Sequence, residues 1–166
     1  MADTNGTARA VADAAKGQLL ASVELAAPPE RVFTAIASSE ITAWWVRPGV
    51  FDTREWTGEV RAGGRWRAAG MTRGQPYVQG GEFVEVDSPL MLKYTWDGAG
   101  TPAAPSTVSY VLEPVGGGTR LTLRHSGFAS RDMCHAFAIG WETSLAPKRE
   151  PVEVGDRSRP DLVLHL

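Results

Sequence analysis

The stretch SRDMCHAFAIGWETSL, residues 130–145, decides the fold because it has the pattern of one amphipathic helix near the C-terminus. Its large apolar side chains recur at every fourth position, at Met133, Phe137, Trp141 and Leu145. This spacing places them on one stripe of an α-helix. Ser130 is suited to cap the first turn, and Pro147 ends the helix. A stripe with two large aromatic rings needs a partner surface, so we expect the rest of the chain to form a curved sheet around this helix.

Length and composition indicate a single globular domain. The chain has 166 residues, of which 43% are hydrophobic and 22% charged, and this is enough to bury a core. Its 17 basic and 19 acidic residues give a net charge of −2, which argues against a nucleic-acid partner. A single cysteine, Cys134, excludes an internal disulfide. No stretch resembles a secretory signal or is apolar enough to span a membrane, so we expect a cytoplasmic protein without a membrane span.

The N-terminal third predicts one strand followed by two short helices. Residues 1–17 are small and polar, and we expect a flexible leader there. Apolar and polar residues alternate over residues 18–26, as in a half-buried strand. Pro29 suits the first turn of a helix over residues 30–37, and a second short helix is predicted over residues 39–46.

Glycine-punctuated runs of alternating residues over 55–126 predict an antiparallel meander, interrupted by a loop over residues 97–105. The side chains that the alternation places on the inner face are Trp66, Leu90, Leu92, Tyr94, Trp96, Val108, Tyr110, Leu112, Leu121, Leu123 and His125. Those expected on the outer face include Arg65, Arg67, Arg120 and Arg124. With the helices, this order predicts an α+β fold in which a sheet packs against one long helix.

We expect a single domain over residues 18–146. The segment 147–166 is charged and contains two further prolines after Pro147, but it ends in the apolar sequence VLHL. It is either disordered or its last residues pair with a sheet edge, and the sequence does not decide between these alternatives.

The chain resembles the homologues of the activator of the Hsp90 ATPase, which belong to the helix-grip superfamily of START domains and the birch pollen allergen. The similarity lies in APPERVFTAI at 27–36, AGGRW at 62–66, GGEFVEVDSPLMLKYTW at 80–96, GGGTRLTLRHSGF at 116–128 and HAFAIGWETSL at 135–145. The resemblance implies an antiparallel sheet of about seven strands gripping the C-terminal helix. It also implies a cavity between them that holds a hydrophobic small molecule in many relatives. Relatives usually extend the last helix beyond the point where Pro147 ends it here.

Six tryptophans are many for this length, and several fall on the inner face. Aromatic walls suit a ring-containing or acyl ligand, although the same side chains are also the ordinary filling of a core. The residues that we expect to line a ligand cavity are Trp66, Leu92, Tyr94, Trp96, Tyr110, Leu123, His125, Phe137 and Trp141.

The polar candidates for chemistry are few. His125 is expected to point inward, where it would either bind a polar group of a ligand, act as a general base, or form hydrogen bonds within the core. Cys134 and His135 are adjacent on a helix, so their side chains point about 100° apart. A nucleophile and its base must face each other, which argues against this pair as a catalytic pair. No histidines and cysteines have the spacing of metal ligands, so we expect no metal and no cofactor.

Three functions are consistent with these patterns. The favoured hypothesis is a non-enzymatic protein that binds a hydrophobic or aromatic small molecule, lipid-like or polyketide-like, in the cavity. The second is a co-chaperone-like module that docks a chaperone or another protein on the outer sheet face. The third is a cavity enzyme, of cyclase or hydrolase type, that uses His125.

Overall fold

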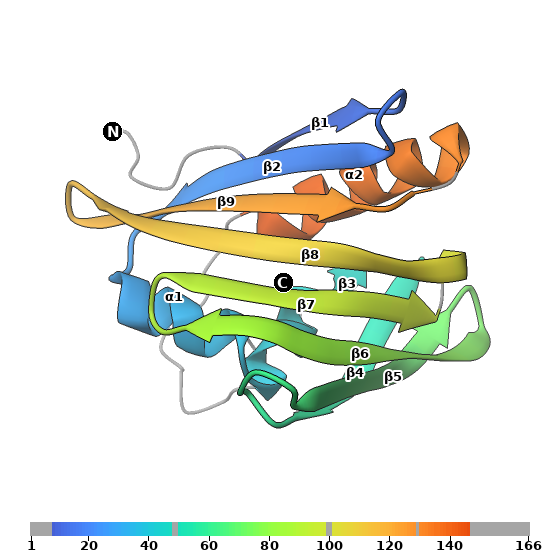
Figure 1. Cartoon of the computed structure of the whole chain (residues 1–166), viewed down its shortest axis with the longest axis horizontal. Helices are drawn as coiled ribbons and strands as arrows, with labels where there is room; N and C mark the ends of the chain where they lie inside the picture. The colour runs from blue at the N-terminus through green and yellow to red at the C-terminus, as the bar shows by residue number, and fades with distance from the viewer. Residues whose placement is uncertain (1–7, 48–49, 99–100, 129, 147–166) are drawn as a thin grey trace.

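One curved sheet and one long helix define the architecture (Figure 1). The computed structural model describes residues 8–47, 50–98, 101–128 and 130–146. Its elements are β1 (Arg9–Asp13), β2 (Gln18–Leu25), α1 (Pro29–Ile36), the 3₁₀-helix η1 (Ser39–Ala43), β3 (Val46–Arg47), β4 (Phe51–Gly58), β5 (Arg65–Thr72), β6 (Gln75–Asp87), β7 (Met91–Gly98), β8 (Thr101–Val115), β9 (Gly118–Ser126) and α2 (Arg131–Leu145). In this part of the chain, nine strands form one antiparallel sheet in the order β1-β2-β9-β8-β7-β6-β5-β4-β3.

The sheet curves around α2. In the view of Figure 1, α2 lies behind β2 and β9, and β3 and β4 lie behind β6 and β7. α2 contacts β1 and β2 at one end of the strand order and β3 at the other end. One helix reaches both ends of a nine-stranded sheet only if the sheet twists and coils strongly. This confirms the predicted α+β helix-grip fold, with nine strands in place of about seven.

β1 lies within the stretch that was predicted as a flexible leader, so that prediction is wrong for Arg9–Asp13. β1 pairs with β2 along its whole length, and the backbone N–H of Ala10 donates a hydrogen bond of 3.0 Å to Glu142 on α2. Its side chains contribute little, and Val11 is 69% exposed. Backbone pairing rather than an apolar pattern therefore holds this edge strand, which is why the alternation of residues did not predict it.

The loop predicted over residues 97–105 is also wrong in part, because β8 begins at Thr101. Pairing of β8 with β9 starts only at Thr107, and the register with β7 shifts near the end of that strand. Pro102 and Pro105 therefore fall between the paired positions. A strand tolerates proline where no backbone N–H is needed for the ladder.

The predicted inner face of the sheet forms the core. The residues that the structure buries as predicted are Trp66, Leu92, Tyr94, Trp96, Val108, Tyr110, Leu112, Leu121, Leu123 and His125. Leu90 is the exception, at 45% exposure, because it lies in the turn before β7 rather than in the strand. Arg65 and Arg67 are exposed on either side of the buried Trp66, as expected.

The two short helices close one end of the sheet. α1 occupies the predicted stretch and buries Val32, Phe33 and Ile36 against the core. The second helix is a 3₁₀-helix, η1, capped by the hydroxyl of Ser38. It brings the buried Trp45 into the core directly after its last turn.

α2 has the predicted boundaries, and Ser130 caps it by accepting a hydrogen bond of 3.0 Å from the backbone N–H of Met133. Its buried face differs from the predicted stripe. Trp141 and Leu145 are buried as expected, but Cys134 and Ala138 replace Met133 and Phe137 on the buried side. The helix is thus turned so that the side chains of Met133 and Phe137 remain half exposed.

Removing the cap of α2 should destabilise the fold. We expect Ser130→Ala to lower the free energy of unfolding by about 1 kcal/mol, since an orphan N–H of the first turn loses its acceptor. Ser130→Asp keeps an acceptor at this position and should retain the stability of the native protein. Urea denaturation followed by circular dichroism measures both changes, and equal loss in both variants would contradict the assigned cap.

Candidate functional site

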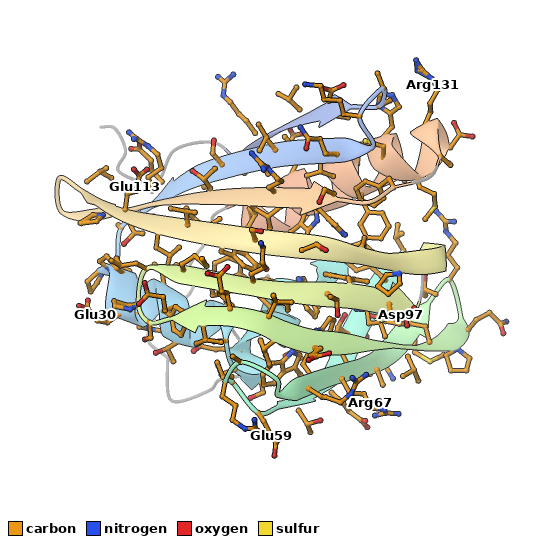
Figure 2. The ribbon with its side chains drawn as sticks, in the orientation of Figure 1. Glu30, Glu59, Arg67, Asp97, Glu113 and Arg131 are labelled. Atoms are coloured by element: carbon orange, nitrogen blue, oxygen red, sulfur yellow. The ribbon has the colours of Figure 1, made fainter. Side chains whose placement is uncertain are left out.

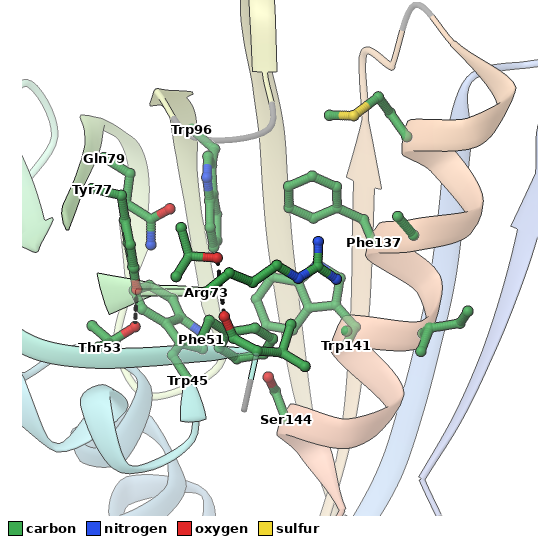
Figure 3. A pocket seen from close by; sticks show the side chains of 16 residues that line it. Trp45, Phe51, Thr53, Arg73, Tyr77, Gln79, Trp96, Phe137, Trp141 and Ser144 are labelled. Carbon is green, nitrogen blue, oxygen red and sulfur yellow. Dashed lines mark hydrogen bonds between the residues drawn. The ribbon is translucent and has the colours of Figure 1, made fainter. Parts of the chain in front are cut away.

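A pocket with a volume of about 530 Å³ lies between α2 and the strands β4 to β7 (Figure 3). α2 contributes Met133, Ala136, Phe137, Ile139, Gly140, Trp141 and Ser144 to its lining. The opposite side consists of Trp45, Val50, Phe51, Thr53, Thr72, Arg73, Tyr77, Gln79 and Trp96. The rotation of α2 explains the position of the pocket, because it turns the half-exposed side of the helix toward β4 to β7. The volume is in the range of small-molecule sites.

Several aromatic rings line the pocket, and Trp96 contacts three of them. Its ring centroid lies 5.0 Å from that of Trp45, 5.7 Å from that of Trp141 and 5.9 Å from that of Phe137. The rings of Trp141 and Phe137 are nearly perpendicular to that of Trp96, at 79° and 88°. Edge-to-face contacts of this kind hold large rings in fixed orientations. The wall is therefore a rigid apolar surface suited to flat or extended apolar groups.

The polar side chains of the pocket lie mostly on its sheet side, with Ser144 on α2 as the exception. The hydroxyl groups of Thr53 and Tyr77 form a hydrogen bond with each other, and Gln79 lies beside them (Figure 3). Burial is the main reason that the pKa of Tyr77 is raised, so its hydroxyl is neutral at physiological pH. Such groups orient a ligand by hydrogen bonds without carrying charge.

Among the described buried tryptophans, two indole N–H groups have a hydrogen-bond partner and two have none. Trp66 donates its N–H to the carbonyl oxygen of Thr95 at 3.0 Å, and Trp141 donates to His125. By contrast, the buried Nε1 atoms of Trp45 and Trp96 have no hydrogen-bond partner among the described residues. A buried donor without an acceptor costs about 1–3 kcal/mol. Both of these rings line the pocket.

His125 is a structural residue of the core. The indole N–H of Trp141 can only donate, so Nδ1 of His125 accepts this bond at 3.0 Å. Nε2 then carries the proton and donates to the hydroxyl of Ser106 at 2.7 Å, which in turn donates to the carbonyl oxygen of Trp96. Burial lowers the pKa of His125 to about 3, so the ring is neutral at physiological pH. Both ring nitrogens are thus used within the core.

The structure divides the nine sequence-predicted cavity residues into two groups. Trp96, Phe137 and Trp141 line the pocket. The other six lie outside its lining and are buried in the core: Trp66, Leu92, Tyr94, Tyr110, Leu123 and His125. The last group includes the buried pair of Tyr94 and Tyr110, whose hydroxyl oxygens lie 2.9 Å apart.

Sequence reasoning missed several lining residues on the sheet side. Trp45 had a signal in the tryptophan pair at 44 and 45, but nothing indicated which ring would turn inward. Tyr77 and Gln79 share one parity of β6, but the glycines at 80 and 81 interrupt the alternation that would identify the inner face. Arg73 lies in the turn between β5 and β6, where alternation gives no prediction.

The remaining nucleophile and metal candidates lie away from this pocket. Cys134 is buried on α2, and its thiol donates a hydrogen bond of 3.2 Å to the carbonyl oxygen of Gln18, while His135 is exposed. Burial raises the pKa of the Cys134 thiol, which disfavours the nucleophilic thiolate. No cluster of three metal-ligating side chains occurs among the residues described by the structure.

The outer sheet face carries charges of both signs (Figure 2). Arg120 forms ion pairs with Glu24 at 3.0 Å and with Glu113 at 3.9 Å, and Lys93 lies 3.9 Å from Glu85. Of the arginines expected on the outer face, Arg120 is therefore paired with carboxylates of the same face. None of the described helices is long and apolar enough to cross a membrane.

A curved antiparallel sheet that grips a C-terminal helix, with a pocket between them, defines a helix-grip protein. A sequence model of the family described as Activator of Hsp90 ATPase homolog 1-like protein matches residues 26–147, and the chain belongs to this family. No curated protein matches the sequence.

Solved structures share the fold. Protein CV1439 from Chromobacterium violaceum is 26% identical, with coverage of 78% of this chain and 92% of that chain and a TM-score of 0.66. Protein Ms6760 from Mycobacterium smegmatis is 23% identical, with coverage of 82% and 90% and a TM-score of 0.68. CalU16 from Micromonospora echinospora is 23% identical, with coverage of 87% and 82% and a TM-score of 0.56. At these sequence identities, the comparisons show that the fold is shared and nothing about a shared activity.

The buried, neutral His125 should make the protein sensitive to acid. In the unfolded chain His125 binds a proton near its ordinary pKa of 6.5, whereas in the folded protein it does so only near 3. Its contribution to stability is therefore complete above about pH 6.5 and is lost as the pH falls toward 3, by up to about 1.4 kcal/mol per pH unit. Urea denaturation between pH 7 and about pH 4.5 measures this slope.

The matched variant is His125→Gln, which retains a donor and an acceptor but does not titrate. We expect the free energy of unfolding of the native protein to fall more steeply with acid than that of the variant. The comparison isolates His125 because the carboxylates titrate in both proteins. Parallel curves would contradict a buried neutral histidine.

Proposed function

We propose that this protein binds a hydrophobic or aromatic small molecule, lipid-like or polyketide-like, in the pocket between the sheet and α2, and that it does so without catalysis. The observation that carries the proposal is the pocket itself, with its volume of about 530 Å³ and its wall of Trp45, Trp96, Phe137 and Trp141. An apolar ligand gains about 25 cal/mol for each Å² of apolar surface that it removes from water.

The distribution of polar groups supports binding rather than turnover. General acid–base catalysis requires a titratable group within hydrogen-bond reach of the substrate and a pKa near the working pH. His125 lies outside the pocket lining, has both nitrogens bound and has a pKa lowered to about 3. The described lining contains no histidine, cysteine, aspartate, glutamate or lysine. A cyclase or hydrolase that uses His125 is thus the less favoured alternative.

The co-chaperone-like alternative is supported by the family name alone. It would place an acidic partner on the outer face of the sheet, where Arg120 is already paired with Glu24 and Glu113. Binding in the pocket therefore remains the proposal. A cytoplasmic location, expected from the single cysteine, is part of it.

A plug in the pocket should abolish binding. Gly140 lies on α2 in the pocket lining, and a Cβ atom added there would meet nothing within 4 Å. Gly140→Trp therefore places an indole in the pocket, and we expect it to weaken binding of the uncharged dye N-phenyl-1-naphthylamine by at least about tenfold. Titration of the dye, which fluoresces in apolar sites, measures the affinity.

Two matched variants control this experiment. Gly140→Ala leaves most of the pocket open and should bind the dye within about twofold of the native protein, while it stabilises the helix by about 0.5–1 kcal/mol. His135→Trp adds the same ring at an exposed position of α2 outside the pocket lining and should bind normally. If Gly140→Trp folds and binds the dye as tightly as these two controls, the pocket is not the binding site.

A further inference from the structure

The pocket lining carries one formal charge. Arg73 is the sole ionisable side chain of the described lining besides the neutral Tyr77, and no carboxylate is among these residues. Figure 3 shows the guanidinium group of Arg73 reaching across the pocket from the sheet side toward Trp141 on α2. An apolar wall thus ends in a single positive group.

The backbone holds Arg73 at this position. It lies in the turn between β5 and β6 with a φ of 49°, followed by Gly74 with a φ of 82°. A positive φ at both positions is typical of a tight hairpin turn. Asparagine or glycine is the usual residue at the first position, where this chain has an arginine. The backbone N–H of Arg73 and the hydroxyl of Thr72 both donate to the carbonyl oxygen of Val50, at 2.9 and 3.0 Å. These two bonds tie the turn to the start of β4, beside the pocket.

The guanidinium group has no acidic partner in the described part of the chain. Asp52 is close enough to Tyr77 to raise its pKa, but it forms an ion pair of 2.9 Å with Arg54. The other arginine ion pairs of the described residues join Arg31 to Glu40, Arg61 to Glu59, and Arg120 to Glu24 and Glu113. Arg73 is therefore available to an anion that enters from solvent.

Two indole donors that are unpaired in the described part of the chain belong to rings of the pocket wall. The buried indole N–H groups of Trp45 and Trp96 have no acceptor among the described residues. A ligand with an anionic group complements the guanidinium group of Arg73, which is unpaired among the residues that the structure describes. Guanidinium binds carboxylate through two parallel hydrogen bonds, which combine charge with geometry.

We propose that the ligand of this pocket is an apolar small molecule with a carboxylate group, bound with the carboxylate on Arg73 and the apolar body between Trp96, Phe137 and Trp141. This inference rests on the proposed function, since it names the ligand class of the same pocket. Because Arg73 is exposed at the pocket mouth, water screens part of the attraction, and we expect its effect on affinity to be about tenfold rather than larger.

The test compares decanoate with decan-1-ol, which share one alkyl chain and differ in the charged group. Each displaces N-phenyl-1-naphthylamine from the native protein and from Arg73→Gln at pH 7.5. We expect the preference for decanoate over decan-1-ol to fall about tenfold in Arg73→Gln, with the affinity for the alcohol unchanged. Arg73→Lys, which keeps the charge but not the paired donors, should retain part of the preference.

Arg67→Gln is the matched control, because it removes an exposed arginine from the outer face of β5 and should leave the preference unchanged. If the dye binds and Arg73→Gln leaves the preference intact, or if decanoate does not displace the dye from the native protein, the carboxylate inference is wrong while the pocket stands. If the dye does not bind, or if Gly140→Trp does not exclude it, the proposed function fails and this inference fails with it.

Discussion

The hydrogen bond from the indole of Trp141 to Nδ1 of His125 is the interaction on which the arrangement of the site depends. It joins α2 to β9, and the chain of bonds continues through Ser106 on β8 to the carbonyl oxygen of Trp96 on β7. One helix and three successive strands are thereby fixed relative to each other. Trp141 and Trp96, at its two ends, are also two walls of the pocket. The same network that holds the helix on the sheet therefore also fixes two adjacent rings of the pocket wall.

This network works because it contains no charge. A protonated His125 would have no acceptor for the proton on Nδ1, since Trp141 only donates there. Burial enforces the neutral ring and fixes the proton on Nε2. As a consequence, His125, the strongest catalytic candidate in the sequence, has a structural role in the core. A histidine that orients two aromatic walls stabilises a binding surface, which is a different task from proton transfer.

Much of the fold followed from local pattern, although half of the buried stripe of α2 did not. The parity around Trp66 and the cap at Ser130 were both predictable, because alternation and capping depend on neighbouring residues alone. β1 was not, since an edge strand is held by its backbone. The site was only partly predictable. Trp96 and Trp141 followed from periodicity, but Arg73 reaches the pocket only because the sheet coils and brings the turn between β5 and β6 toward α2. Such coiling depends on the whole sheet.

Polar side chains in the core and in the pocket lining differ in how completely they are paired. In the core, each polar side chain discussed above has a partner: Tyr94 bonds to Tyr110, Trp66 to Thr95 and His125 to two neighbours. On the pocket side, two indole donors lack acceptors and a guanidinium lacks a carboxylate among the described residues. A folded chain normally satisfies nearly all of its buried donors. Both unpaired indole donors belong to rings that line the pocket, so the unused hydrogen-bonding capacity of the described core lies next to the proposed site.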